Sequence, residues 1–131
     1  PGPVPNPTRL CLVHTDAGPG NLIDGPAGLR LIDWQCPGLG DPAEDLHAFL
    51  SPAFMILFEH APLTANERAA FLDAYGDDAI AERLVAMEPF FGYRMLAYCV
   101  RRQAELAVTD PELARRYREA FHAQITRLES A

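Results

Sequence analysis

The stretch HTDAGPGN occupies residues 14–21, and LIDWQCPGLGDPAEDL occupies residues 31–46. Both contain clusters of glycine and proline, which indicate loops rather than regular elements. Three side chains in these loops carry oxygen atoms suited to chemistry. Asp16 accepts hydrogen bonds when ionised and is a candidate to take a proton from a hydroxyl group. Asn21 supplies a neutral carbonyl oxygen and Asp33 a charged one, and Mg²⁺ prefers hard oxygen ligands of both kinds.

Short apolar runs beside these loops predict strands at 9–13, 22–23 and 29–32. The sequence DGPAG between the second and third runs suits a hairpin turn. A hairpin at this place brings Asp33 back beside Asn21. One base and two metal ligands are what in-line phosphoryl transfer requires, because that reaction depends mainly on positioning and charge neutralisation.

From residue 41 onward the apolar spacing is helical. Asp41 before Pro42 is a helix start signal, and Thr64 with Glu67 forms a capping box. We expect the helix after Thr64 to bury Phe71, Leu72 and Tyr75 and to stop near Gly76. The other helices are expected after Asp41, over 52–60, from about Asp77 to Leu106 with a kink or break at Pro89, and from Asp110 onward. In the last helix, the four-residue spacing of Glu112 and Arg116 predicts an ion pair.

The composition excludes several classes of protein. The chain has 131 residues, 49% of them hydrophobic, and a net charge of −7, which is typical of one globular domain with one core. An acidic chain argues against a general nucleic-acid binder and against docking on anionic lipid. We find no apolar run long enough to span a membrane and no signal peptide. All eleven basic residues are arginines, so neither a Walker A lysine nor a Schiff base is available.

The three cysteines are widely spaced, at Cys11, Cys36 and Cys99. Their number and spacing argue against a disulfide framework or a structural zinc site, and a reducing cytoplasm is the expected compartment. We expect each cysteine to be a small buried hydrophobic residue.

Three motifs in order now point to a family. His14-x-Asp16 followed by Asn21 resembles the catalytic loop of protein-kinase-like enzymes, and Ile32-Asp33-Trp34 stands where those kinases carry a metal-binding Asp-Phe-Gly. With the following G-D-P-x-x-D-L, the order resembles most closely the aminoglycoside phosphotransferase and choline kinase-like family. The resemblance is sharp over residues 10–50 and rests on helical pattern alone over 51–131.

The resemblance implies an α+β fold. A proline-rich linker at 1–8 would lead into the C-terminal, mainly helical lobe of a protein-kinase-like fold at 9–131, whose small β hairpin bears the catalytic and metal-binding loops. Family members carry a further N-terminal lobe, whose strand lysine pairs with the nucleotide phosphates, and a helix before the catalytic loop. We therefore expect this chain to be part of a longer protein and to be inactive alone. The missing helix should leave an apolar face uncovered, and self-association through that face is a hypothesis.

The resemblance also implies roles for individual residues. Asp16 would be the catalytic base, and His14 would support its loop by hydrogen bonding. Asn21 and Asp33 would hold Mg²⁺ against the phosphates of ATP or another nucleoside triphosphate.

Further residues would support that site. Asp41 and Asp45 would brace the loop and cap a helix, and Trp34 would pack beneath Asp33 as a core residue. Thr15 departs from the pattern, because many members have Gly there.

Three functions remain open at this point. The leading hypothesis is part of an ATP-dependent phosphotransferase that moves the γ-phosphate to the hydroxyl of a small molecule, with the acidic helices hinting at a cationic or neutral polyol, while an antibiotic, choline, an amino alcohol and a sugar all remain open as acceptors. The second is a non-catalytic kinase-like binding module or pseudoenzyme. The third is a metallohydrolase that uses His14, Asp16, Asp33 and Asp45. The aromatic residues of the long helix suit either a cage for a cationic substrate or the core; they are Phe90, Phe91, Tyr93 and Tyr98.

Overall fold

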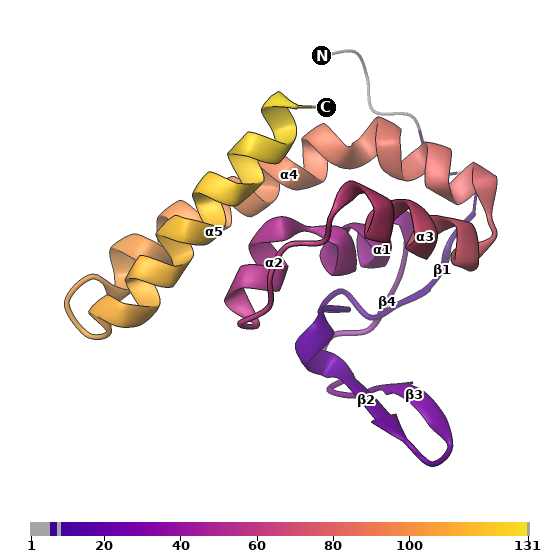
Figure 1. The fold of residues 1–131 in the computed structure, drawn as a ribbon, viewed down its shortest axis with the longest axis horizontal. Coiled ribbons are helices and arrows are strands. Elements are labelled where there is room, and N and C mark those ends of the chain that lie inside the picture. The colour runs from indigo at the N-terminus through magenta and orange to yellow at the C-terminus, as the bar shows by residue number, and fades with distance from the viewer. Residues whose placement is uncertain (1–5, 8, 131) are drawn as a thin grey trace.

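The computed structural model describes residues 6–7 and 9–130, so most of the linker expected at 1–8 lies outside the described residues. The fold is α+β and mainly helical, with two small antiparallel sheets (Figure 1). In chain order the elements are β1 (Cys11–Val13), a 3₁₀ turn (Pro19–Asn21), β2 (Leu22–Gly25), β3 (Gly28–Leu31), β4 (Gly38–Gly40), α1 (Pro42–Leu50), α2 (Pro52–Leu57), α3 (Ala65–Tyr75), α4 (Asp78–Leu106) and α5 (Pro111–Glu129).

The predicted hairpin is confirmed. Strands β2 and β3 pair antiparallel, with Leu22 opposite Leu31. The second sheet was not predicted, because β4 consists of a glycine-rich segment typical of a loop. Its Gly40 lies opposite Cys11, and a Cβ there would stand 2.8 Å from a methyl carbon of Val13. A side chain at position 40 would therefore push the two strands apart.

The predicted helix starts are also confirmed, and each has a side-chain cap. The Asp41 carboxylate accepts a hydrogen bond from the backbone N–H of Ala43, which satisfies one of the free donors at the start of α1. Thr64 and Glu67 form the complete capping box of α3. Gly76 ends that helix at a φ of 71°, a conformation that glycine adopts without steric cost.

Helix α4 does not divide at Pro89. It continues through this residue to Leu106, although Figure 1 shows that its axis bends along its length. The C-terminal helix α5 packs along it, and Gly92 of α4 permits the approach, because a Cβ there would stand 2.7 Å from a methyl carbon of Leu128. The predicted Glu112–Arg116 pair is wrong: Arg115 binds Glu112, and Arg116 reaches Glu59 at 2.7 Å.

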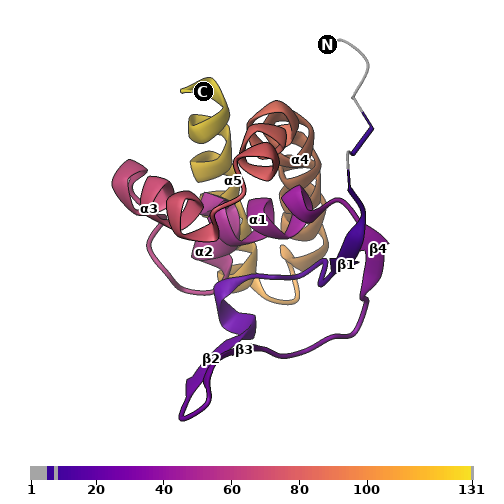
Figure 2. The same ribbon diagram turned by 90° about the vertical axis from the view of Figure 1, so that its right-hand side faces the viewer.

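The helices enclose the core, and Figure 2 shows the β2–β3 hairpin extending away from them. One buried cluster joins α1 to the first half of α4, and the second joins α2 to the rest of α4 and to α5. The cysteine prediction holds for Cys99 alone, because Cys36 is exposed and Cys11 is half-buried. The prediction that Tyr75 is buried is also wrong, since this residue lies at the exposed end of α3.

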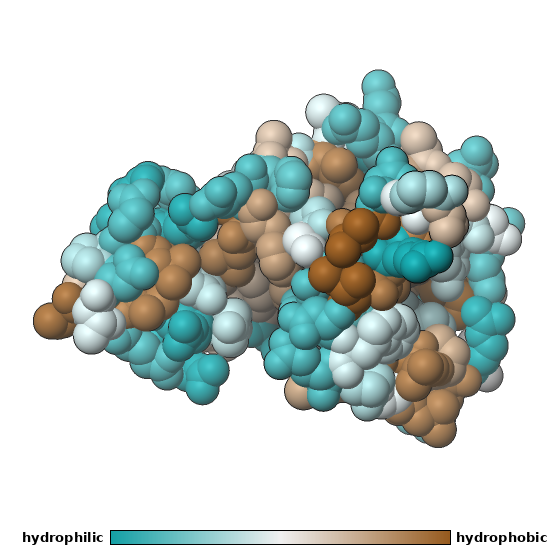
Figure 3. All heavy atoms as spheres, turned by 90° about the horizontal axis from the view of Figure 1, so that it is seen from below, coloured by the Kyte–Doolittle hydropathy of each residue, from teal (hydrophilic) through white to brown (hydrophobic). Residues whose placement is uncertain are grey.

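An apolar pocket of about 490 Å³ opens between the strands and helices α1 and α3. Its walls include Leu12, Leu29 and Phe49, and the first two of these are more than half exposed. Seen from the hairpin side, hydrophobic patches alternate with polar ones (Figure 3). Within the described ranges, we find no helix with the length and apolar content needed to cross a bilayer.

Candidate active site

The loop after β1 is built around His14, whose side chain is almost completely buried. Its Nε2 lies 2.7 Å from the carbonyl oxygen of Ile32, and its Nδ1 lies 3.3 Å from the backbone N–H of Asp16. Nε2 must therefore donate and Nδ1 must accept, which assigns the neutral tautomer with its proton on Nε2. Both ring nitrogens are occupied by the backbone. His14 thus ties the loop to the hairpin and has no free nitrogen to act as a base.

Asp45 braces the same loop from the first turn of α1. Its two carboxylate oxygens accept hydrogen bonds from the backbone N–H groups of His14, at 2.7 Å, and Thr15, at 2.9 Å. The Thr15 hydroxyl donates to the carbonyl oxygen of Cys36. Thr15 has a φ of 68°, a left-handed conformation that is costly for a β-branched residue. The three hydrogen bonds hold it there.

Asn21 orients the candidate base. Its side-chain N–H₂ group donates to the carbonyl oxygen of Asp16 at 2.8 Å and to the Asp16 carboxylate at 3.1 Å. The 3₁₀ turn that carries Asn21 contains Gly20 and follows Gly18, and a Cβ at either glycine would overlap the ring of Phe58. Close packing of this ring against the turn therefore fixes the distance between Asp16 and Asn21.

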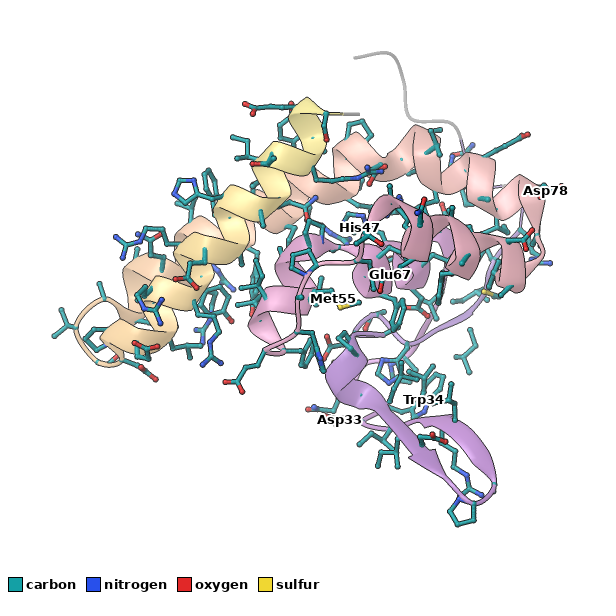
Figure 4. All side chains as sticks on the ribbon, viewed as in Figure 1. Asp33, Trp34, His47, Met55, Glu67 and Asp78 are labelled. Carbon is teal, nitrogen blue, oxygen red and sulfur yellow. The ribbon has the colours of Figure 1, made fainter. Side chains whose placement is uncertain are left out.

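The hairpin returns the chain to this point. The Ile32 N–H donates to the Asn21 carbonyl oxygen at 2.9 Å, so the next residue, Asp33, leaves the hairpin beside Asn21. Asp33 has a φ of 63°, the second strained position of the site, and its side chain is exposed. Figure 4 shows Asp33 and Trp34 together at the base of the hairpin.

The core position expected for Trp34 is wrong. The side chain is 45% exposed, and its indole N–H donates to the carbonyl oxygen of Leu31. One edge contacts the His14 ring, with 4.6 Å between ring centres. Trp34 therefore covers His14 from outside, and nearly half of its own surface stays exposed.

The two remaining predicted aspartates, Asp41 and Asp45, stabilise different parts of the structure. Asp45 holds the loop, as described above, whereas Asp41 joins helices. In addition to capping α1, the Asp41 carboxylate accepts a hydrogen bond from Arg83 of α4 at 2.8 Å. Both carboxylates thus stabilise the frame that supports Asp16.

Asn21 and Asp33 carry the kinds of oxygen atom that a magnesium ion prefers. Because the Asn21 N–H₂ group is held by Asp16, its side-chain oxygen is the atom directed elsewhere. Asp33 follows Ile32, whose N–H binds the Asn21 backbone carbonyl oxygen, so its carboxylate comes from the adjoining segment. Two protein oxygens are sufficient, since Mg²⁺ completes its six ligands with waters and phosphates.

The metallohydrolase set is not assembled. In the part of the chain that the structure describes, no three His, Cys, Asp or Glu side chains are grouped to hold a metal ion. Two of its four members, His14 and Asp45, are instead bound to the backbone.

A second pocket, of about 380 Å³, opens directly beside Asp16. Helix α4 supplies one wall through Phe91, Arg94 and Tyr98, and Phe54 of α2 supplies another. Sequence reasoning named Phe91 and Tyr98 but missed the other two. The spacing of residues 91, 94, 95 and 98 places them on one helical face, and this was the available signal.

His47 of α1 also lines this pocket, and its side chain is buried. Burial lowers the pKa of His47 from 6.5 to about 4. The imidazole is therefore neutral at pH 7, and it adds no charge beside Asp16.

A loop with a hydrogen-bonded aspartate, two further oxygen-bearing side chains on adjoining segments and a neighbouring pocket are compatible with phosphoryl transfer. The comparisons agree: residues 3–90 match the phosphotransferase enzyme family (APH), and the chain belongs to this family. It is similar to the thiamine kinases of Shigella boydii serotype 4 (strain Sb227) and Escherichia coli (strain K12 / DH10B), each 48% identical over 44 residues. The matched stretch is 34% of this chain and 16% of either relative. No solved structure gives a significant match.

Proposed function

We propose that this chain forms the C-terminal lobe of a kinase-like phosphotransferase, which moves the γ-phosphate of ATP to a hydroxyl group of a small molecule. The observation that carries the proposal is the arrangement of Asp16, Asn21 and Asp33 along two adjoining segments. Asn21 donates to the Asp16 carboxylate, and the hairpin delivers Asp33 beside Asn21. These are the base and the two oxygen ligands that the sequence predicts.

In this proposal each residue has one task. Asp16 orients the acceptor hydroxyl and takes its proton, with the carboxylate held by Asn21. The side-chain carbonyl oxygen of Asn21 and the carboxylate of Asp33 hold Mg²⁺, which when bound neutralises charge on the nucleotide phosphates. His14 and Asp45 position the loop through its backbone. The thiamine kinases among the relatives make thiamine the first acceptor to test.

We further propose that the chain alone transfers phosphate very slowly. It contains no lysine, so the phosphate contact that a lysine supplies in related kinases is absent from this sequence. Such contacts provide a large part of the electrostatic stabilisation of the transition state. Nucleotide binding is therefore a better first readout than turnover.

The test is Mg²⁺-dependent binding of ATP, measured by titration calorimetry on three proteins. The parent chain should bind ATP more tightly with Mg²⁺ than without it. Asp33→Asn should remove this difference, because it replaces the charged ligand. Asp24→Asn is the matched control, since Asp24 is an exposed aspartate in the same hairpin, and it should behave as the parent. Equal binding with and without Mg²⁺ in the parent would overturn the proposal.

A second candidate function is a non-catalytic kinase-like module that docks a partner. The apolar pocket beside α1 and α3 favours it, because soluble monomers rarely expose large contiguous apolar patches. We propose that this face also mediates self-association. Light scattering at high micromolar concentration tests the idea: a dimer that Leu12→Glu dissociates supports it, and a monomeric parent contradicts it.

A further inference from the structure

The pocket beside Asp16 carries information about the acceptor. We propose that it selects a compact alcohol built on a flat ring with no more than one positive charge, and that Arg94 excludes polycationic acceptors. This inference rests on the proposed function, because it treats the pocket at the candidate base as the acceptor site.

The size and the walls of the pocket come first. A volume of about 380 Å³ is near the lower end of the usual range for small-molecule pockets, about 300–1,000 Å³. This space suits a molecule of one or two rings. Phe54, Phe91, Tyr98 and the buried Met95 supply much of the wall. A polyol would leave hydroxyl groups without hydrogen-bond partners against such walls, which is unfavourable. The polyol indicated by the acidic composition is therefore not favoured.

The charges near the pocket argue against a polycation. Asp16 supplies the carboxylate that lines the pocket, and Arg94 supplies a guanidinium group, which carries the opposite charge. The neighbouring Glu44 is already paired with Arg94 at 2.5 Å. His47 is neutral at pH 7, as shown above. A substrate with several ammonium groups would find one acidic partner here, and that partner is committed to the reacting hydroxyl.

The aromatic rings are not free to form a cation cage. The guanidinium of Arg94 lies over the Phe91 ring, 5.4 Å from its centre, and that of Arg101 lies 5.7 Å from the centre of Tyr98. A cation is attracted to the face of an aromatic ring. Each of these two rings already has an arginine near it, and a further cation would meet that positive charge. The rings therefore favour apolar contact with the acceptor over binding of several cationic groups.

The experiment measures acceptor binding directly, without nucleotide, by NMR titration of the full 131-residue chain. The probes are thiamine and pyridoxine, which are ring alcohols, choline, which has no ring, and kanamycin, a polycationic amino sugar. We expect the ring alcohols to shift the signals of Phe91, Met95 and Tyr98, and kanamycin to bind at least tenfold more weakly.

Two variants separate selection from packing. Arg94→Glu should improve kanamycin binding relative to pyridoxine at least tenfold, because it reverses the charge at the pocket. Arg118→Glu is the matched control: it makes the same change on the exposed side of α5, away from the pocket, and it should leave the ratio as in the parent.

Three results would overturn the inference: kanamycin or choline binding as tightly as the ring alcohols, an unchanged ratio in Arg94→Glu, or no shift at the pocket with any probe. The outcome is independent of the test of the proposed function. Ring-alcohol binding without Mg²⁺-dependent ATP binding would reject the phosphotransferase and keep the selective pocket. The reverse result would reject the pocket assignment alone.

Discussion

Replacing Asp45 by asparagine tests how the candidate catalytic loop is held. The carboxylate accepts hydrogen bonds from two consecutive backbone N–H groups, at 2.7 and 2.9 Å. Hydrogen bonds to a charged group contribute about 1.5–3 kcal/mol each. Asparagine keeps one acceptor oxygen, without the charge, and turns an N–H₂ group toward the other backbone donor. Either the N–H of the buried His14 or that of Thr15 then loses its acceptor, and the first of these cannot turn to water. We expect Asp45→Asn to lower the free energy of unfolding by about 2–3 kcal/mol.

Thermal unfolding and hydrogen exchange provide the assay. For a domain of this size, a loss of 2–3 kcal/mol lowers Tm by roughly 6–12 °C. The amide protons of His14 and Thr15 should lose protection, while those in α5 change only by the global shift. Asp73→Asn is the control, since Asp73 is exposed on α3, and surface changes of this kind stay within about 0.5 kcal/mol. An equal Tm shift in both variants, or intact protection at His14 and Thr15, would refute the bracing role.

Three further predictions concern the helical body. The pKa of His47 is about 4 in the folded chain and near 6.5 when unfolded, so the unfolded chain binds the proton more tightly. The free energy of unfolding should therefore fall by about 3 kcal/mol as pH drops from 6.5 to 4. In denaturant titrations His47→Leu should flatten this pH dependence, and His60→Leu should not. Burial raises the pKa of the Cys99 thiol to about 11. A thiol reagent should therefore label the exposed Cys36 first and Cys99 only on unfolding. Labelling of both cysteines at equal rates would contradict the packing around Cys99. Gly92→Ala should lower stability by about 1–3 kcal/mol in chemical denaturation, because its methyl group collides with α5; an unchanged midpoint would show that α5 shifts freely.

The sequence predicts those parts of the fold whose signals are local. The DGPAG turn and the caps at Asp41 and Thr64 lie within a few residues of the structure they determine, and all three are confirmed. The candidate base and magnesium ligands are also local, since two short loops and one hairpin carry them.

The failures involve contacts between distant segments. Strand β4 exists because Gly40 fits against Val13, and no spacing rule reveals that pairing. Arg116 pairs with Glu59 in the turn after α2 rather than with Glu112, which is nearer in the sequence. Arg94 lines the pocket beside Asp16 only because α4 passes the loop that carries Asp16. Trp34 is apolar enough for a core, but its exposure depends on which elements surround it.

The central claim is that Asn21 and Asp33 together form the metal site of a phosphotransferase. Its most direct test is NMR of the chain with substoichiometric Mn²⁺ and ADP, because bound Mn²⁺ broadens the signals of nearby nuclei. We expect broadening to begin at Asn21, Asp33 and Asp16 and to disappear in Asp33→Asn, while Asp24→Asn leaves it unchanged. Broadening that centres on other acidic residues, or that persists in Asp33→Asn, would contradict the assignment.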